Sequence, residues 1–371
     1  MPGGLHPPLS VMESWPAPNT VDPESHGPAA TIVCAVFGSI AVVIVAMRLW
    51  ARCIIQRRGG LDDIIVAVAL IPLIGINIAV PIGSSVYGEI HHTWDNSLTK
   101  LIGERKVAIG AELFYVLASS LIKVSVLLFY RRMGQRTVSP RFLTVIWISI
   151  ASVIAYSVAF FVVIFVSCRP FHAFWMEIDP LWSATNPYTC YDEGAHLIAA
   201  TGISLTQDII ATTLPAILCF RLQMPLRQKL ALNAVFALGY LAAVIAGIRI
   251  YFVWRMFYDT YDATWEAWYC WILAALEINI AATCSSLPAV KVFFRDSVLV
   301  AVRSLRHSRS ASRSNGSGSV QKRSVQDRDR DHREGGRLSG DTDRYLLKGV
   351  SATELKSFAL PIGRGGGDDS V

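Results

Sequence analysis

Residues 64–87 read IIVAVALIPLIGINIAVPIGSSVY, a run of 24 residues in which no side chain carries a charge. A hydrocarbon core about 30 Å thick is crossed by a helix of about 20 apolar residues, so this run is long enough to span a membrane. The composition of the 371 residues agrees, because 53% are hydrophobic and only 17% are charged, against about 25% charged in soluble domains. The chain is therefore predicted to be a membrane protein.

Six further apolar stretches of similar length lie on either side of this run, which predicts an all-α membrane protein built as a seven-transmembrane-helix bundle. Residues 30–295 would form the transmembrane domain. Residues 1–29 are rich in proline and residues 296–371 in Ser, Arg, Asp and Gly, so we expect an extended N-terminal segment and a disordered C-terminal tail. The predicted spans are Ala30–Met47, Ile64–Tyr87, Val107–Tyr130, Phe142–Val166, Ala195–Phe220, Leu230–Trp254 and Trp268–Val290.

The distribution of basic residues between the loops predicts the orientation of the bundle. The loops after the first, third and fifth spans hold 11 Lys and Arg residues, whereas the N-terminal segment and the other loops together hold 5. Because positive residues are retained on the cytoplasmic side, we expect a multi-pass protein with its N-terminus outside and its C-terminus in the cytoplasm. The plasma membrane is the expected location.

Five charged side chains stand out inside the predicted spans, where each costs about 2.5–3.5 kcal/mol to insert without a partner or water. Glu112 and Lys123 are three helical turns apart and share one face of the third span. Lys123 lies at about the depth of Asp208, so we predict an ion pair between them. We expect Glu277 to be hydrated or protonated, and Arg249 to reach the outer interface. Together these residues form either an intramembrane ligand or ion site or a structural contact between helices.

Two cysteines bracket the loop between the fourth and fifth spans, which faces the oxidising exterior in the predicted orientation. We predict a Cys168–Cys190 disulfide that holds this loop over the mouth of the bundle. Cys270, near the outer end of the seventh span, is the alternative partner.

On the cytoplasmic side, the sequence Gly59-Gly60-Leu61-Asp62-Asp63 precedes the second span. Glycines followed by carboxylates at the start of a helix are typical of an N-terminal cap. The two carboxylates also lie among the arginines of neighbouring loops. A second interpretation is therefore an inner-face ion lock between Asp62 and Asp63 and the pair Arg131 and Arg132.

The sequence lacks the H-E-x-x-H and G-x-S-x-G motifs and any phosphate-binding glycine loop. We therefore predict that the protein is not an enzyme, and we expect no cofactor and no nucleic-acid partner. The residues His91, His92, Asp95, Asp192, Glu193 and His196 have the chemistry of metal ligands, but exposed loop histidines are the favoured interpretation. Lys123 is the one lysine in the predicted spans, so the seventh span has none for a retinal Schiff base.

The tail begins with a basic stretch, because residues 291–323 contain eight Lys and Arg residues against the single acid Asp296. Such a patch is expected to bind the anionic inner leaflet of the bilayer. Arginines alternate with serines over residues 303–314, a pattern typical of basophilic kinase sites, and phosphorylation there would weaken the attachment. A solvated linker is the alternative.

A series of short motifs runs along the chain. They are Gly60-Leu61-Asp62-Asp63, Lys123-Val124-Ser125, Phe129-Tyr130-Arg131-Arg132, Cys168-Arg169-Pro170, Leu214-Pro215, Gly247-Ile248-Arg249-Ile250, Glu277-Ile278-Asn279-Ile280 and Cys284-Ser285-Ser286-Leu287-Pro288-Ala289. In this order the chain resembles the fungal rhodopsin-domain integral membrane proteins over about Ala30–Arg295. The resemblance implies a seven-helix, rhodopsin-like fold and a filamentous-fungal source. That family includes receptor-like proteins and members encoded beside mycotoxin pathways such as the satratoxin cluster.

These observations predict a receptor-like membrane protein that binds an unknown small-molecule ligand from outside and couples to a cytosolic signalling partner, or to a kinase at the tail. The alternative is a transporter or accessory membrane component of a secondary-metabolite pathway. In that case the charges of Lys123, Asp208 and Glu277 would line the transport path.

Overall fold

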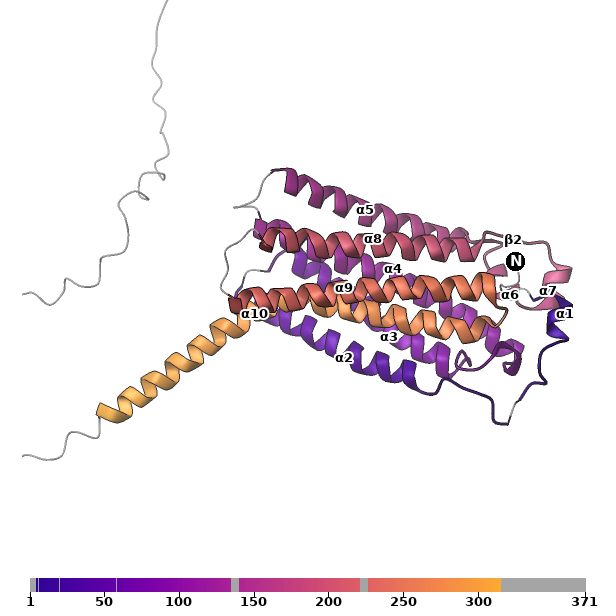
Figure 1. The fold of residues 1–371 in the computed structure, drawn as a ribbon, viewed down its shortest axis with the longest axis horizontal. Helices are drawn as coiled ribbons and strands as arrows, with labels where there is room; N and C mark the ends of the chain where they lie inside the picture. The colour runs from indigo at the N-terminus through magenta and orange to yellow at the C-terminus, as the bar shows by residue number, and fades with distance from the viewer. Residues whose placement is uncertain are drawn as a thin grey trace, which may run out of the picture. The chain divides into compact units, whose positions relative to one another are not determined.

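The computed structural model of the chain describes residues 5, 7–19, 21–57, 59–134, 140–220 and 226–314. Nearly all of this part is helical, and the few strand residues form one short hairpin (Figure 1). In chain order the elements are α1 (Leu9–Met12), α2 (Ala29–Leu49), η1 (Trp50–Ile55), α3 (Leu61–Ser85), η2 (Thr93–Asp95), α4 (Leu98–Gly134), α5 (Pro140–Val166), β1 (Cys168–Arg169), α6 (Ala173–Met176), α7 (Pro180–Thr185), β2 (Thr189–Cys190), α8 (Glu193–Phe220), α9 (Leu226–Trp254), η3 (Arg255–Asp259) and α10 (Ala263–Ser314).

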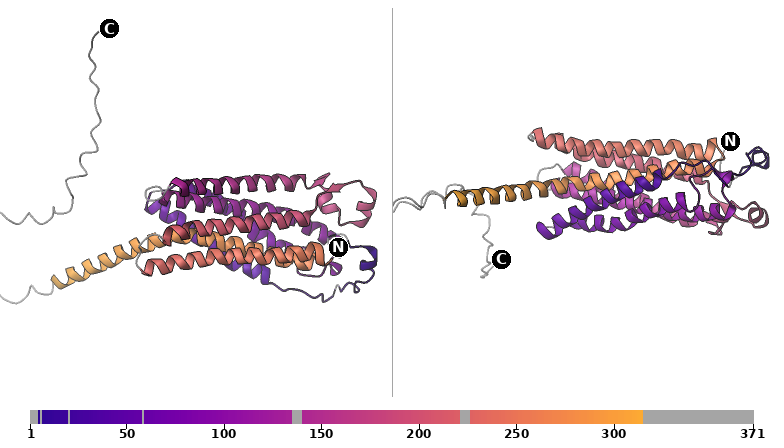
Figure 2. Two further views of the ribbon diagram at one scale, coloured as in Figure 1. Left: turned by 45° about the horizontal axis from the view of Figure 1, so that its top comes forward. Right: turned by 90° about the horizontal axis from the view of Figure 1, so that it is seen from below.

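Seven helices in the described residues are long and apolar enough to cross a membrane, namely α2, α3, α4, α5, α8, α9 and α10. This confirms the predicted seven-helix membrane fold. The seven run side by side, and α6, α7, β1 and β2 gather at one end (Figures 1 and 2). We call this the disulfide end, because it holds the bond between Cys168 and Cys190, and we call the opposite end, where Arg48 lies, the arginine end.

Helix α4 is the central helix of the bundle and α5 lies at its periphery. In the most apolar window of each helix, 67% of the residues of α4 are buried against 22% of those of α5. The outer face of α5 is apolar, with Ile148 and Val158 exposed by 64% and 58%, whereas Val153 on its inner face is 2% exposed. Apolar side chains that face lipid cost no free energy, because the lipid tails are themselves apolar. The interior of the bundle can therefore hold the polar side chains.

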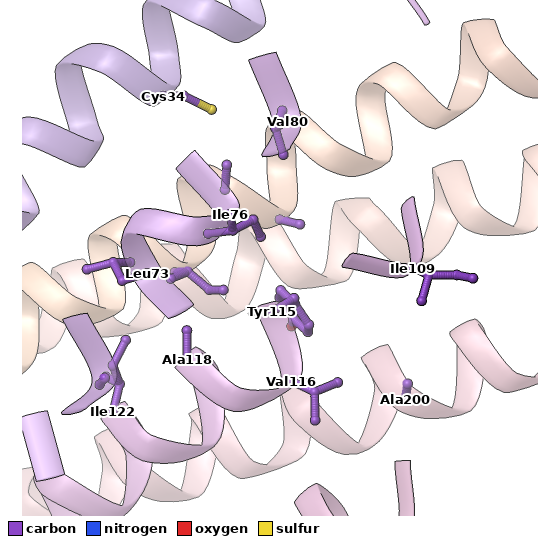
Figure 3. Close-up of a cluster of buried hydrophobic side chains, with 14 of the residues drawn as sticks. Cys34, Leu73, Ile76, Val80, Ile109, Tyr115, Val116, Ala118, Ile122 and Ala200 are labelled. Atoms are coloured by element: carbon purple, nitrogen blue, oxygen red, sulfur yellow. The ribbon is translucent and has the colours of Figure 1, made fainter. Parts of the chain in front are cut away.

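The bundle core is apolar between α3 and α4. Leu73 and Ile76 of α3 lie in one buried cluster with Ala118 of α4 (Figure 3). A Cβ atom added at Gly75 would lie 2.8 Å from the Phe114 ring, so the glycine lets the ring of α4 lie directly against the α3 backbone. Small residues at helix contacts permit this close approach, which favours van der Waals packing in a membrane.

One polar contact joins α3 to α10 in the middle of this core. Asn77 and Asn279 form a reciprocal amide pair, in which each side chain donates to the other at 3.0 and 2.8 Å. Interhelical hydrogen bonds of this kind contribute about 0.6–2 kcal/mol in membranes. The pair fixes how far α3 and α10 can slide along each other.

Helix α10 continues to Ser314, past residue 295, where we expected the transmembrane domain to end. The sequence after Pro288 contains no glycine or proline as far as Ser314, so no residue with poor helix propensity ends the helix there. The rest of the predicted disordered tail, residues 315–371, lies outside the described residues. The side chains of the predicted lipid-binding and phosphorylation stretch, residues 291–323, also lie outside them.

Candidate functional site

A folded loop covers the disulfide end of the bundle. Cys168 and Cys190 are joined by a disulfide and face each other in the antiparallel β1–β2 pair. The loop between them forms α6 and α7, and the Asp179 carboxylate caps α7 by accepting a hydrogen bond from the Leu181 amide at 3.0 Å. Cys270, the alternative disulfide partner, is a free thiol. We call residues 168–190 the lid.

Arg105 attaches the lid to the bundle. Its guanidinium binds both carboxylate oxygens of Glu193 in α8, at 2.6 and 2.9 Å, and it also donates to Glu177 of the lid at 3.3 Å. The same group lies 4.0 Å from the centre of the Phe174 ring. Sequence reasoning treated Arg105 as a loop residue, because hydropathy alone placed the start of the helix at Val107. The helix in fact begins at Leu98, so Arg105 belongs to its buried face.

Beneath the lid lies a cavity of about 100 Å³. Its walls come from α4, α8, α9 and α10, and from the lid, and Leu5 and Pro7 of the N-terminal segment also contribute. Most of the lining is apolar or aromatic, which suits a small organic molecule. The charged residues that line it are Glu104, Arg105, Glu112, Glu193 and Arg249.

An ion pair between α9 and α10 forms the floor of the cavity. Arg249 donates to Glu277 from Nε at 3.2 Å and from Nη2 at 3.1 Å. Tyr115 of α4 donates to the other oxygen of Glu277 at 2.7 Å and accepts a hydrogen bond from Arg249. The prediction that Arg249 reaches the interface is therefore wrong, since its side chain is 8% exposed. We expected Glu277 to be hydrated or protonated, but it accepts hydrogen bonds from Arg249 and Tyr115 instead. The ion pair with Arg249 offsets the cost of burying both charges.

Below the floor, the structure places Lys123 beside Asp208. The Lys123 ammonium is 3.2 Å from the Asp208 carboxylate and donates to the Ser204 hydroxyl at 2.7 Å. The Ser204 hydroxyl is also 3.2 Å from the Tyr115 hydroxyl, so hydrogen bonds connect the floor to the Lys123 pair. A second hollow of about 50 Å³ lies on the side of this pair that faces the arginine end.

Glu112 is not part of this chain of contacts. Its carboxylate lines the cavity and is 3.0 Å from Nε2 of His196, one helical turn into α8. His196 therefore does not meet the loop histidines. His92 lies 2.5 Å from the Asp262 carboxylate and stacks between Trp94 and Trp265, with centroid distances of 4.5 and 4.0 Å. At 17% exposure it is not the solvent-exposed histidine we expected.

At the arginine end, the carboxylates of the predicted ion lock have a different main partner. Arg48, whose side chain is fully buried, lies 3.1 Å from Asp62 and 3.2 Å from Asp63, and it donates to the Ser285 carbonyl at 3.0 Å. Arg132 contacts Asp62 at 3.4 Å, from a side chain that is 39% exposed. Sequence reasoning missed Arg48, because a single arginine at the end of an apolar run reads as the start of a loop.

The other arginine of the predicted lock does not reach the carboxylates in this structure. The Arg131 guanidinium lies over the Trp147 ring, 4.6 Å from its centre. Asp63 also has the second role that the sequence allowed, since its side chain accepts a hydrogen bond from the Gly60 amide at 3.2 Å and so caps α3. Capping and ion pairing thus occur in the same pair of carboxylates.

The fold and the cavity define a helical multi-pass membrane protein whose spans enclose a mostly apolar cavity. The chain belongs to the fungal rhodopsin domain family, whose family model matches residues 47–296.

Three curated relatives illustrate the range of this family. The chain is 29% identical to a SAT4 family membrane protein of Emericella nidulans over 51% of this chain and 46% of the relative. It is 24% identical to the Receptor GIN3 of Arthrobotrys oligospora, over 69% and 60%, and 23% identical to the Wortmanamides biosynthesis cluster protein C of Talaromyces wortmannii, over 71% and 69%. The chain thus spans about half the length of the first of these and about three fifths of the second. No solved structure matches it.

Proposed function

We propose that this chain is a receptor-like protein that binds a small molecule in the cavity under the lid and transmits binding to cytosolic partners at the arginine end. The observation that carries the proposal is the cavity of about 100 Å³ under the lid, which is largely apolar and carries a few oriented polar groups. These are the general properties of small-molecule sites. The relative that is named a receptor supports the same interpretation.

The contacts below the cavity offer a route for transmission. Arg249 and Glu277 belong to α9 and α10, and Tyr115 connects them to α4 and, through Ser204, to Lys123. A ligand that touches the floor therefore touches the ion pair that sets the spacing of α9 and α10. A ligand with different affinities for two spacings of these helices shifts the population between them.

The orientation predicted from the basic residues is part of the proposal, with the lid outside and the arginine end in the cytoplasm of the expressing fungus, at the plasma membrane. Cys53 in η1 has an exposed side chain near the arginine end and serves as a native label. A membrane-impermeant maleimide should label Cys53 only after the cells are permeabilised, and Cys53→Ser should abolish that signal. Labelling of Cys53 in intact cells would overturn the orientation.

Ligand binding is tested by filling the cavity. Ala108 lines it, so Ala108→Phe reduces its volume, whereas Ala159→Phe makes the same change on the exposed face of α5. The full-length chain in lipid nanodiscs is incubated with an extract of the fungal culture medium, and retained compounds are identified by mass spectrometry. We expect compounds that bind the wild type and the Ala159→Phe variant but not the Ala108→Phe variant. Equal retention by all three proteins would refute binding in the cavity.

The same compounds distinguish a receptor from a transporter. In proteoliposomes, a receptor binds them without moving them across the bilayer, so no uptake is expected. Uptake that is lost in Asp208→Asn, below the floor, would instead support transport through the bundle, since Asp208 borders the second hollow.

A further inference from the structure

Most of the charged side chains around the cavity have an oppositely charged partner, but one carboxylate has none among the described residues. The unpaired carboxylate indicates the charge that a ligand would carry. Both guanidinium groups that line the cavity already have carboxylate partners, Arg105 in Glu193 and Glu177 and Arg249 in Glu277. Glu112 has His196. Both guanidinium groups are therefore already paired with carboxylates, and one buried atom of theirs, Nε of Arg105, has no hydrogen-bond partner among the described residues.

Glu104 is different from these residues. Its side chain lines the cavity, yet the structure records no hydrogen bond or ion pair for its carboxylate among the described residues. It lies one position before Arg105 on α4, and the guanidinium of Arg105 is directed to Glu193 and the lid. A carboxylate that faces a largely apolar cavity without a partner is energetically costly, and a bound cation would remove that cost.

A second carboxylate lies directly behind Glu104. Glu89, in the segment after α3, is 1% exposed, and its Oε1 atom has no hydrogen-bond partner. Glu89 and Glu104 together line a small hollow of about 10 Å³, which has room for one group of the size of water or ammonium. It shares Glu104, Ala108 and Trp271 with the walls of the main cavity. Gly83 makes room for the Glu89 carboxylate, since a Cβ atom there would lie 3.2 Å from Oε2. The small hollow is thus an acidic recess at the side of the apolar cavity.

The electrostatics of this recess favour a positive charge. Burial and the nearby charge of Glu104 raise the pKa of the Glu89 carboxyl well above its usual range, because burial and a second carboxylate both disfavour its negative charge. The other titratable groups near Glu89 are the thiols of Cys34 and Cys270, which are uncharged when protonated, and the cation near Glu104 is Arg105, which is committed elsewhere. The Trp271 ring on the shared wall adds an aromatic face that attracts cations.

We propose that Glu104 and Glu89 bind the ammonium group of a cationic small-molecule ligand whose apolar body occupies the main cavity. The inference rests on the proposed ligand-binding function and deepens it by naming the chemical class of the ligand. An organic amine fits the observations better than a bare metal ion, because the recess shares a wall with the mostly apolar main cavity, which suits an organic body.

The test compares primary amines with alcohols of the same skeleton on the full-length chain in zwitterionic nanodiscs. The pairs are butylamine and butan-1-ol, phenethylamine and 2-phenylethanol, and tryptamine and tryptophol, with empty nanodiscs as the blank. Affinity is measured by calorimetry. Location is measured by protection of Cys270, a free thiol in the cavity wall, from N-ethylmaleimide, with the labelled peptide identified by mass spectrometry.

We expect at least one amine to protect Cys270 and to bind at least tenfold more tightly than its alcohol. Glu104→Gln keeps the size of the side chain and removes its charge, so it should reduce amine affinity about tenfold and leave alcohol affinity unchanged. Glu89→Gln should act in the same direction. Glu13→Gln, which removes an exposed carboxylate remote from the recess, is the matched control and should change nothing.

Two results would overturn the inference. If alcohols protect Cys270 as well as amines do, or if amine affinity survives Glu104→Gln and Glu89→Gln, the cavity binds ligands without selecting a cation, and only the proposed function stands. If no compound of either class protects Cys270, both the inference and the cavity as a ligand site are refuted.

Discussion

Arg48→Met tests the ion cluster at the arginine end most directly. The side chain of Arg48 is fully buried, and those of Asp62 and Asp63 are 3% and 1% exposed. Methionine keeps much of the apolar length of the arginine stem, so the substitution mainly removes the charge and leaves two buried carboxylates without their principal partner. Removing one member of a buried ion pair costs about 3–5 kcal/mol, and we expect the free energy of unfolding to fall within that range.

The neighbouring Arg132 supplies a matched comparison. It contacts the same Asp62 carboxylate, at 3.4 Å, but 39% of its side chain is exposed. An ion pair so accessible to solvent contributes about 0–1 kcal/mol, so Arg132→Met should cost much less than Arg48→Met. Both substitutions remove a guanidinium by the same chemical change. Arg48 is buried and also pairs with Asp63 and the Ser285 carbonyl, so the difference between the two variants measures the greater cost of losing buried contacts.

The free energy of unfolding is measured on the full-length chain in mixed micelles, by titration with sodium dodecyl sulfate followed by circular dichroism. A triple variant that adds Asp62→Asn and Asp63→Asn to Arg48→Met should recover most of the loss, since no unpaired charge then remains buried. Equal losses for Arg48→Met and Arg132→Met, or a triple variant as unstable as Arg48→Met alone, would show that the reasoning about buried charge is wrong.

Replacing Cys168 and Cys190 together by serine should lower the free energy of unfolding by about 3 kcal/mol, because the bond closes a loop with a sequence separation of 22; an unchanged unfolding curve would contradict this. Glu89→Gln should stabilise the protein at pH 8 and much less near pH 4.5. The raised pKa of Glu89 contributes stability below the ordinary value of 4.5, and that stability is lost as the pH rises through the folded pKa. Thermal unfolding of the wild type and of Glu89→Gln at each pH measures the stability difference between the two proteins. If Glu89 does not titrate, that difference should be the same at both pH values. Burial lowers the pKa of His26 below 6.5, so its contribution is present above pH 6.5 and is lost as the pH falls through the folded pKa. His26→Phe should keep the stacking on Trp268 but reduce the loss of melting temperature between pH 7.5 and 5.5, and an identical loss in wild type and variant would count against it.

The seven spans could be predicted because lipid imposes a length and a polarity on every crossing, and both are visible in a single sequence. The proximity of Lys123 and Asp208 also follows from helix rise, which converts sequence position into depth. Depth does not determine which way a side chain points around its helix. Arg249 and Glu277 lie at similar depths, but only the rotations of α9 and α10 turn them toward each other.

Hydropathy was a poor guide where charged residues occupy the ends of buried helices. Glu104 and Arg105 precede the apolar part of α4, and Arg48 ends the apolar part of α2, so a hydropathy criterion assigned all three to loops. In the folded chain all three are buried. Arg48 and Arg105 have carboxylate partners from other elements, whereas Glu104 lies in the cavity wall with no such partner among the described residues. Such long-range partners leave no local pattern in one sequence.

The amide pair of Asn77 and Asn279 has a consequence for how this bundle can rearrange. Each amide donates one hydrogen bond to the other and accepts one from it. Displacement of α3 along α10 by a single residue would therefore break both hydrogen bonds at once. Tilting about the pair breaks neither. Any transition between two states should therefore be a rocking motion of α3 against α10 with its pivot at these two amides. The ends of the helices would move farthest, and the segments next to the amide pair would move least.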